Sequence, residues 1–371
     1  MKKFQNTEYI TEGCSKVLVF KKKASIRGPS SKGKEPFYNP TMELNRDLSI
    51  LVCQWFLDNS KGHVKLLDGL AASGIRGIRL ANEIHGDFDI TINDWDENAY
   101  NLIMKNIKQY KFENVFAFNR NLNTLLSENK FHYIDIDPFG SPVYFIDSAM
   151  KSIQNNGIIA CTATDTATLC GVYPKVCLRR YSAQPFHSFL MHEIALRILI
   201  GFICREAGKH DKGIDPLVCY STDHYFRVYV KVINDVSYAN DSIKKFKYLD
   251  SEELDFFSKS KVCIGPLWTC KIHNKNVVKQ LRNILFKKNL NTKYELVKFL
   301  DLFEEEADAP AFFYTTDDLA SYLKLPPPKL KNIFEKLKKK GYIVTRTHFS
   351  PTGFKTDAPK KEIEKIFKSR K

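Results

Sequence analysis

Residues 66–83, LLDGLAASGIRGIRLANE, decide the fold. A short apolar run ends at Asp68, small residues including Gly69 and Gly74 follow, and a helical pattern begins near Arg76. Small residues at a strand-to-helix turn let the backbone approach a ligand closely and point the helix N-terminus at it. The stretch therefore predicts a nucleoside-cofactor loop in a doubly wound, Rossmann-like α/β domain, with Asp68, Gly69 and Gly74 at the cofactor.

The strands that follow this loop also end in polar residues. The run DITIND (89–94) ends in Asp94, 20 residues after Gly74, and the next strand ends at Asn119-Arg120-Asn121. At that spacing the Asp94 carboxylate can accept hydrogen bonds from both ribose hydroxyls of a nucleoside. Asn121 is placed to face an adenine edge. Loop and carboxylate together predict a cofactor site.

Short apolar runs alternate with helical patterns up to about residue 233, as is typical of a doubly wound α/β domain. The expected strands are His63–Asp68, Asp89–Asn93, Val115–Phe118, His132–Asp137, Ile158–Thr162 and Leu217–Ile233. The expected helices are Arg76–Glu83, Glu97–Tyr110, Val143–Asn155 and Ser188–Ala207, the last of them largely buried because its apolar residues exceed one stripe.

An acid-proline-aromatic turn, Asp137-Pro138-Phe139, ends the fourth strand, at the edge where α/β folds place their chemistry. A guanine amino group that donates its N–H groups to the Asp137 carboxylate and the Pro138 carbonyl can aim its lone pair at a methyl sulfonium. The methylated nitrogen is strongly acidic, so a carboxylate with a pKa of about 3.9 can take its proton. Phe139 would stack on the base. Asp-Pro is also a common strand exit, but beside a cofactor loop the turn favours an amino-group methyltransferase.

The segment before residue 40 supplies further candidates. A base in folded RNA must be extruded and held by stacking, and Phe37 and Tyr38 are candidates for that contact. Either could instead be an ordinary core aromatic, since the chain has 27 Phe. Residues 21–36, rich in Lys, Gly and Ser, are predicted to form a mobile loop.

The composition sets the broad class. A chain of 371 residues with 43% hydrophobic residues predicts two domains, 1–233 with the cofactor site and 234–371. The nine cysteines are scattered without a C-x-x-C pair, which indicates a reducing compartment. No run approaches the ~18 apolar residues of a membrane span, and no export signal is recognisable. We therefore expect a cytoplasmic protein that neither contacts a membrane nor requires a protein partner.

The C-terminal residues carry most of the net charge of +15. Residues 321–371 hold 15 Lys or Arg against four Asp or Glu, which suits a polyanion, although a solubilising tail has the same composition. A helix with apolar residues at 330, 333, 334 and 337, closed by Gly341 and followed by strand Tyr342–Thr347, predicts a winged-helix-like element. We therefore predict that the second domain binds RNA.

The motifs together resemble those of the tRNA (guanine-26 N2) dimethyltransferases. The matching runs, in order over nearly the whole chain, are EPFYNPTMELNRDLS (35–49), LLDGLAASGIRGIRLANE (66–83), DIDPFGSP (135–142), CTATDTATLCG (161–171) and THFSPTGFKTDAP (347–359). The resemblance implies transfer of two methyl groups from S-adenosylmethionine to N2 of guanine 26 in tRNA. It further implies that Arg46 and Arg76 contact the cofactor, that Asp94 binds its ribose, that the Asp137-Pro138-Phe139 turn holds the guanine, and that Phe37 lies near it.

Two departures from that family's pattern stand out. Asn121 replaces the usual Asp at the adenine contact and is followed by Leu122 instead of a small residue; Asn still offers an acceptor, so binding should survive. Many relatives also carry two cysteine pairs resembling a zinc ribbon, whereas residues 236–270 contain only Cys263 and Cys270. Two thiols cannot complete a tetrahedral site, so we predict no metal.

Other functions remain open at this stage. A methyltransferase acting on N2 of another tRNA guanine would share every motif. A nicotinamide-dependent oxidoreductase would share the loop and Asp94, but it leaves the Asp137-Pro138-Phe139 turn and the basic C-terminus unexplained. A winged-helix regulator with a degenerate nucleotide domain would not need Asp137. Mono- versus dimethylation and the oligomeric state do not follow from the sequence.

Overall fold

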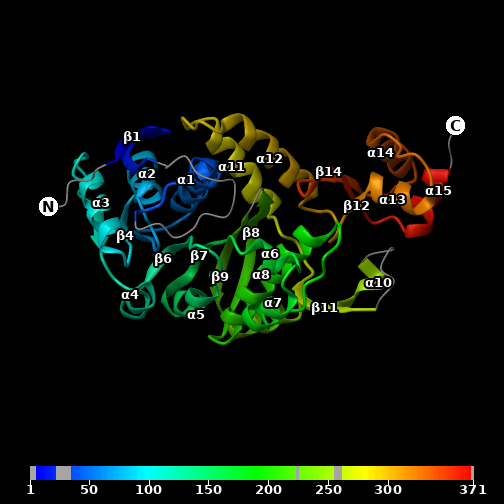
Figure 1. Cartoon of the computed structure of the whole chain (residues 1–371), viewed down its shortest axis with the longest axis horizontal. Coiled ribbons are helices and arrows are strands. Elements are labelled where there is room, and N and C mark those ends of the chain that lie inside the picture. Colours follow the sequence, from blue (N-terminus) through cyan, green and yellow to red (C-terminus); the bar gives the residue numbers. More distant parts are fainter. Residues whose placement is uncertain (1–5, 22–34, 223–224, 255–260, 369–371) are drawn as a thin grey trace. The chain divides into compact units, whose positions relative to one another are not determined.

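The computed structural model describes residues 6–21, 35–222, 225–254 and 261–368 (Figure 1). The predicted mobile loop, 21–36, falls almost entirely outside these residues. The chain forms two compact units: unit 1 comprises Met1–Pro138, Tyr144–Cys161 and Gln280–Val297, and unit 2 comprises Phe139–Val143, Thr162–Lys279 and Lys298–Lys371. These units interleave along the chain, and a domain boundary after residue 233 stays a prediction.

A seven-stranded sheet with the order β5-β4-β3-β6-β7-β9-β8 forms the centre of the fold. Its strands are β3 (Val64–Asp68), β4 (Phe88–Asn93), β5 (Val115–Phe118), β6 (Phe131–Ile136), β7 (Ile153–Ala163), β8 (Lys212–Thr222) and β9 (Tyr225–Asn234). The pairs β4–β5, β3–β4, β3–β6 and β6–β7 are parallel, and β8–β9 is antiparallel. The predicted α/β class is confirmed.

The expectation of a single strand over Leu217–Ile233 was wrong. The chain reverses there, because Thr222 pairs with Tyr225 in an antiparallel hairpin. A 17-residue strand would exceed the usual length of three to ten residues. The apolar and β-branched residues on both sides of the reversal conceal it from a reading of hydrophobicity alone.

Helices connect and cover the strands. The helices before β8 are α1 (Glu43–Asp58), α2 (Ile75–Glu83), α3 (Glu97–Ile107), α4 (Leu122–Glu128), α5 (Val143–Ser152), α6 (Thr166–Leu169), α7 (Pro174–Tyr181) and α8 (Met191–Gly208), with a 3-10 turn at Pro40–Met42. Those between β9 and β12 are α9 (Val236–Ile243), α10 (Ser251–Leu254), α11 (Lys275–Leu285) and α12 (Lys293–Glu306). The four predicted helices are present within a few residues, and α8 is buried along most of its length, as its excess of apolar residues indicated.

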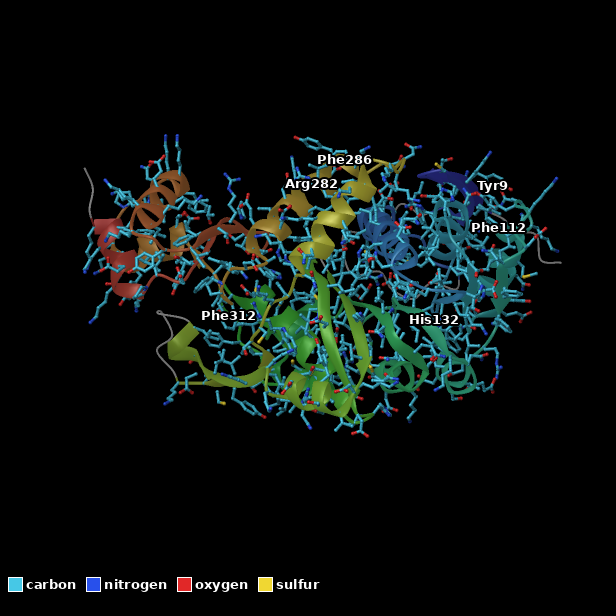
Figure 2. The ribbon with its side chains drawn as sticks, turned by 180° about the vertical axis from the view of Figure 1, so that it is seen from behind. Tyr9, Phe112, His132, Arg282, Phe286 and Phe312 are labelled. Atoms are coloured by element: carbon cyan, nitrogen blue, oxygen red, sulfur yellow. The ribbon has the colours of Figure 1, made fainter. Side chains whose placement is uncertain are left out.

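A hairpin at the start of the chain belongs to unit 1. It consists of β1 (Thr7–Glu12) and β2 (Ser15–Phe20). The backbone of Leu18 donates to Asn106 Oδ1 of α3 at 2.8 Å, and the Tyr110 hydroxyl bonds the backbone of Lys16. Tyr110 stacks on Phe112, which Figure 2 labels with Tyr9 of β1. The anchored hairpin places the carboxylate of Glu12 in the interior, where it is 1% exposed.

The C-terminal part of unit 2 has the predicted winged-helix-like order. It contains β12 (Tyr314–Thr315), α13 (Thr316–Leu323), α14 (Leu330–Lys339), β13 (Val344–Thr347), β14 (Ser350–Thr356) and α15 (Lys360–Lys368), with the three strands in the order β12-β14-β13; a two-stranded sheet, β10 (Phe246–Asp250) and β11 (Cys263–Trp268), precedes it. Ile333, Leu337 and Phe354 lie in its apolar core. Gly341 has a φ of +85° just after α14, which agrees with its predicted role of closing that helix.

None of the helices in the described part of the chain is long and apolar enough to cross a membrane.

Candidate active site

The loop between β3 and α2 requires its glycines for steric reasons. Gly74 precedes α2 with a φ of +77°, a conformation that favours glycine. A Cβ at Gly69 would lie 2.9 Å from Leu122 Cδ1 and 3.0 Å from the Asp135 carbonyl oxygen. At the end of β3, Asp68 Oδ2 accepts the N–H of Gly77 in α2 at 2.9 Å. Burial raises the pKa of Asp68 to about 7. Asp68 therefore ties the end of β3 to the first turn of α2, on the two sides of the loop.

Asp94 is held at the end of β4 by backbone donors. Its Oδ2 accepts the N–H of Ala72 at 2.8 Å, and its Oδ1 accepts that of Asp96 at 3.0 Å. Burial raises the pKa of this carboxyl group, which is 8% exposed. The bond from Ala72 ties Asp94 to the glycine-containing loop, while the contact of Asp94 with a ribose stays a prediction.

Trp95 is a residue that the sequence analysis missed. It directly follows Asp94 and is 70% exposed. A large aromatic ring left in solvent beside a candidate nucleoside site offers a surface on which a base can stack. Its position immediately after the strand-terminal acid is the sequence signal that could have revealed it.

Asn121 and Leu122 begin α4, and both have structural roles. The Asn121 Oδ1 caps the helix by accepting the N–H groups of Asn123 at 3.0 Å and Thr124 at 3.4 Å. The expected adenine contact must therefore share this acceptor with the helix cap. Leu122 is 2% exposed and fills the space beside Gly69. The side chain of Leu122 thus packs against the loop at Gly69.

Arg76 connects α1 and α2 to the Asp137-Pro138-Phe139 turn. Its Nη1 donates to Asn45 Oδ1 at 2.8 Å and to Ser49 Oγ at 2.6 Å, while its Nη2 donates to Asp137 Oδ2. Its Nε lies 3.6 Å from Asp135 Oδ1. The guanidinium is buried and occupied by these protein partners. In this structure its main partner is the carboxylate of the turn.

The turn itself keeps two groups accessible. The Asp137 side chain is 22% exposed, and its second oxygen, Oδ1, has no hydrogen-bond partner among the residues that the structure describes. Phe139 is 53% exposed. Within unit 2, Gly140 N donates to Thr164 Oγ1 at 2.7 Å, and Thr164 N donates to the Gly140 carbonyl at 2.9 Å. Unit 1 thus exposes part of the Asp137 carboxylate, and unit 2 exposes the ring of Phe139 next to a backbone that Thr164 holds.

Arg46 and Tyr38 meet at Glu12, which the sequence analysis did not select. Arg46 donates to both Glu12 oxygens at 2.7 and 2.5 Å and lies over the Tyr38 ring, and the Tyr38 hydroxyl donates to Glu12 Oε1 at 2.8 Å. Burial opposes ionisation of Glu12, but the bonds and charge of Arg46 hold its pKa below the usual value. Burial raises the pKa of Tyr38. Phe37, the residue before Tyr38 in the sequence, is half-buried.

The same ionic group extends into α2. Arg79, with no exposed surface, lies 2.6 Å from Asp47, 3.2 Å from Glu12 and 3.0 Å from Glu83. Nothing in the sequence around ITEGCSK marks Glu12 as a partner of residues 34 and 67 positions later. The pairing depends on the hairpin's placement.

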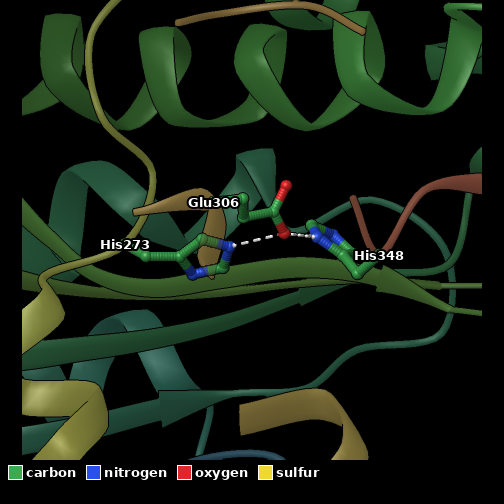
Figure 3. A group of neighbouring side chains, drawn as sticks. All are labelled: His273, Glu306 and His348. Atoms are coloured by element: carbon green, nitrogen blue, oxygen red, sulfur yellow. Dashed lines mark hydrogen bonds and ion pairs between the residues drawn. The ribbon is translucent and has the colours of Figure 1, made fainter. Parts of the chain in front are cut away.

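A second polar group lies in unit 2, where His273, Glu306 and His348 have ligand atoms within 4.8 Å of one another (Figure 3). The Ser221 N–H donates to His348 Nε2 at 3.4 Å, so the proton of a neutral His348 lies on Nδ1 and faces Glu306. A metal-ligating histidine usually donates from its other nitrogen, and here that nitrogen accepts. Burial lowers the pKa of His273 to about 4.

The charges around these three residues are already balanced. Lys355 Nζ lies 2.8 Å from Glu193 and 3.6 Å from Glu306, and Arg197 lies 2.7 Å from Glu193. Phe312, labelled in Figure 2, also donates its N–H to Glu193 at 2.9 Å. Two carboxylates and two cations leave no net negative charge for a dication. The donor set fits a closed polar cluster better than a metal centre, and the absence of a metal stays a prediction.

Comparison with known proteins identifies the family. The family model described as N2,N2-dimethylguanosine tRNA methyltransferase matches residues 13–368. The chain belongs to this family. Family membership confirms the resemblance found in the motifs. The protein is therefore a tRNA methyltransferase that uses S-adenosylmethionine and acts on N2 of guanine.

The similarity to other members of the family extends over nearly the full length. A tRNA (guanine(26)-N(2))-dimethyltransferase of Pyrococcus furiosus is 40% identical over 94% of this chain and 95% of its own. One from Thermococcus kodakarensis is 38% identical over 97% and 98%. The solved structure of Trm1 from Pyrococcus horikoshii with S-adenosyl-L-methionine superimposes with a TM-score of 0.86 at 34% identity, covering 97% of this chain and 99% of that one.

Proposed function

We propose that this protein transfers two methyl groups in succession from S-adenosylmethionine to the exocyclic N2 of guanine 26 in tRNA. The observation that carries the proposal is the turn at the end of β6, where Arg76 fixes one oxygen of Asp137 and the other remains accessible. Relatives named for this reaction match nearly the whole chain.

The side chains around the loop would bind the methyl donor. Asp94 would accept the ribose hydroxyls, Asn121 would contact the adenine edge, and the loop from Gly69 to Gly74 would allow close backbone approach. The bound donor supplies an electrophilic methyl sulfonium. Because Arg46 and Arg76 are bound to carboxylates of the protein, we propose that they act on the cofactor site by positioning Glu12 and Asp137.

The turn would orient the nucleophile. Asp137 Oδ1 would accept one N–H of the guanine amino group and the Pro138 carbonyl the other, which turns the nitrogen lone pair toward the methyl group. As the new N–C bond forms and the C–S bond breaks, the nitrogen becomes acidic and its proton passes to Asp137. Phe139 and Phe37 would hold the extruded base by stacking.

A second transfer uses the same groups. After the first methyl, N2 retains one hydrogen, and a rotation about the bond from C2 to N2 presents it to Asp137. The enzyme must therefore accommodate one methyl group where an N–H had pointed at the Pro138 carbonyl. Dimethylation depends on space at that carbonyl.

Residues 234–371 are proposed to form the basic tRNA-binding domain. The excess of Lys and Arg in 321–371 supports this role. We further propose that the enzyme acts without a protein partner and in the cytoplasm. All nine cysteines have free thiols, which is consistent with a reducing compartment.

Nucleoside mass spectrometry of an unmodified tRNA transcript incubated with S-adenosylmethionine tests the function. We expect N2-methylguanosine to appear first and N2,N2-dimethylguanosine to replace it, and a transcript with adenine at position 26 to remain unmodified. Dimethylguanosine formed in that control would show that the enzyme modifies a guanine at another position. N7-methylguanosine or ribose methylation alone would exclude the mechanism.

A further inference from the structure

Helix α7, labelled in Figure 1, has one buried and one exposed face within unit 2. Cys177 and Tyr181, four residues apart, have no exposed surface. Lys175, Leu178 and Arg179, at positions i, i+3 and i+4, lie together on the opposite face and are exposed. The fold therefore uses only one side of this helix.

Large apolar side chains on and just before α7 are exposed to solvent. Val172 is 52% exposed, Tyr173 57% and Leu178 53%, all within seven residues. Single exposed apolar residues are ordinary on protein surfaces, but three in one short segment make that segment a candidate interaction site. We call Tyr173, Lys175, Leu178 and Arg179 the α7 face.

The positive charge of the α7 face is not compensated. The sequence has no Asp or Glu between Asp165 and Glu193. Arg180 pairs with Asp165 at 3.2 Å, whereas Lys175 and Arg179 have no ion-pair partner among the described residues. In the C-terminal part, by contrast, Lys340 and Lys365 both lie 2.6 Å from Glu362.

Hydrogen bonds connect α7 to the turn that carries Phe139. Ser141 Oγ donates to the Tyr181 hydroxyl at 2.8 Å, and that hydroxyl donates to Asp165 Oδ1 at 2.7 Å. Ser141 is two residues after Phe139, and Thr164, beside Asp165, bonds Gly140. The α7 face is thus fixed relative to the exposed Phe139 ring by a short chain of contacts inside unit 2.

We propose that the α7 face binds the tRNA strand next to the target guanine. Lys175 and Arg179 contact phosphates, and Tyr173 stacks on an exposed base or ribose, the combination by which proteins hold unpaired nucleotides. The inference rests on the proposed function and adds a contact surface separate from the basic C-terminal residues. This contact would hold the RNA strand next to the guanine that must be extruded from the RNA helix.

Equilibrium binding of unmodified tRNA at several salt concentrations tests this surface. The double variant Lys175→Glu with Arg179→Glu should bind about tenfold or more weakly, with the slope of log K against log[salt] shallower by about one per lost phosphate contact. Tyr173→Ala should weaken binding about tenfold and leave the slope unchanged. The matched control is Lys108→Glu with Lys111→Glu, which reverses two exposed charges three residues apart near the end of α3.

Unchanged tRNA affinity and slope in the α7 double variant would overturn the proposal, and so would an equal loss in the control. S-adenosylmethionine affinity and the melting temperature should stay at wild-type values; if charge reversal prevents folding, Lys175→Gln with Arg179→Gln takes its place. Concentration-dependent dimerisation of the wild type, abolished by the double variant, would assign the face to self-association and refute RNA contact. Binding is measured without turnover, so it decides on this surface even if the methylation assay contradicts the proposed reaction.

Discussion

The buried ionic group around Arg76 and Asp137 in unit 1 and the one around Glu306 and Lys355 in unit 2 are built from the same kinds of side chain. In the unit 2 group the carboxylates of Glu193 and Glu306 are balanced by Lys355 and Arg197, and the histidines face Glu306. In unit 1 Arg76 satisfies one oxygen of Asp137 and leaves the other accessible. Buried charge alone therefore does not mark an active site; an accessible lone pair on a fixed group does.

The largest effect should come from removing that lone pair. Asp137→Ala should lower single-turnover methylation by about 100- to 10,000-fold, because the amino group loses its acceptor and the proton its destination. Affinities for tRNA and S-adenosylmethionine should change little. Asp147→Ala, which removes a half-exposed carboxylate of α5 paired with Lys151, is the matched control. A near-normal methylation rate of Asp137→Ala would show that another residue accepts the hydrogen bond and the proton of the amino group.

Removing the cation from the polar cluster around Glu306 should lower the stability of the protein and leave the methylation reaction unaffected. Lys355→Met leaves the carboxylates of Glu193 and Glu306 without their shared cation, which should cost about 3–5 kcal/mol of unfolding free energy. Urea denaturation measures the loss, and Lys361→Met, at an exposed position, should stay within about 0.5 kcal/mol. If Lys355→Met were as stable as wild type, the cluster would not be the closed unit described.

An intermediate effect is expected at the ribose carboxylate. Asp94→Asn retains the shape but loses the charge, so S-adenosylmethionine affinity should fall about 10- to 100-fold, the usual value of hydrogen bonds to a charged group. Calorimetric titration provides the measurement. Asp68→Asn, at the end of β3, should weaken binding less, since Asp68 bonds the backbone of Gly77. The reverse ranking would contradict the assignment of the ribose contact to Asp94.

The smallest effect is a pH dependence from His273. Its pKa is about 4 when folded, because of burial, against about 6.5 when unfolded. The unfolded chain binds the proton more readily, so stability falls as the pH drops from about 6.5 towards 4. The His273 ring stacks on Phe303 with a centroid separation of 4.4 Å, so His273→Phe keeps an aromatic ring there and should lack this part of the loss, about 1 kcal/mol at pH 5.5. Parallel stability curves for the two proteins would show that His273 does not titrate there.

Local patterns in the sequence predicted the parts of the site that depend on neighbouring residues. The glycine loop, Asp94 at its spacing, and the turn after β6 all follow from strand and helix alternation and lie where predicted. The ion pairs of Arg46 and Arg76 could not be predicted from local patterns. Their partners Glu12 and Asp137 are 34 and 61 positions away, and only the folded chain brings them together. Tyr38, a candidate for stacking, is bound to Glu12 for the same reason.

The contact between Leu122 and Gly69 constrains how this chain can evolve. A Cβ at position 69 would meet both methyl carbons of Leu122, at 2.9 and 3.0 Å, so the larger residue at 122 excludes any but the smallest at 69. The backbone carbonyl oxygen of Asp135 lies 3.0 Å from the same Cβ position, so a shorter side chain at 122 would remove only one of the two obstacles. Position 69 is therefore restricted to glycine whichever side chain a lineage carries at 122.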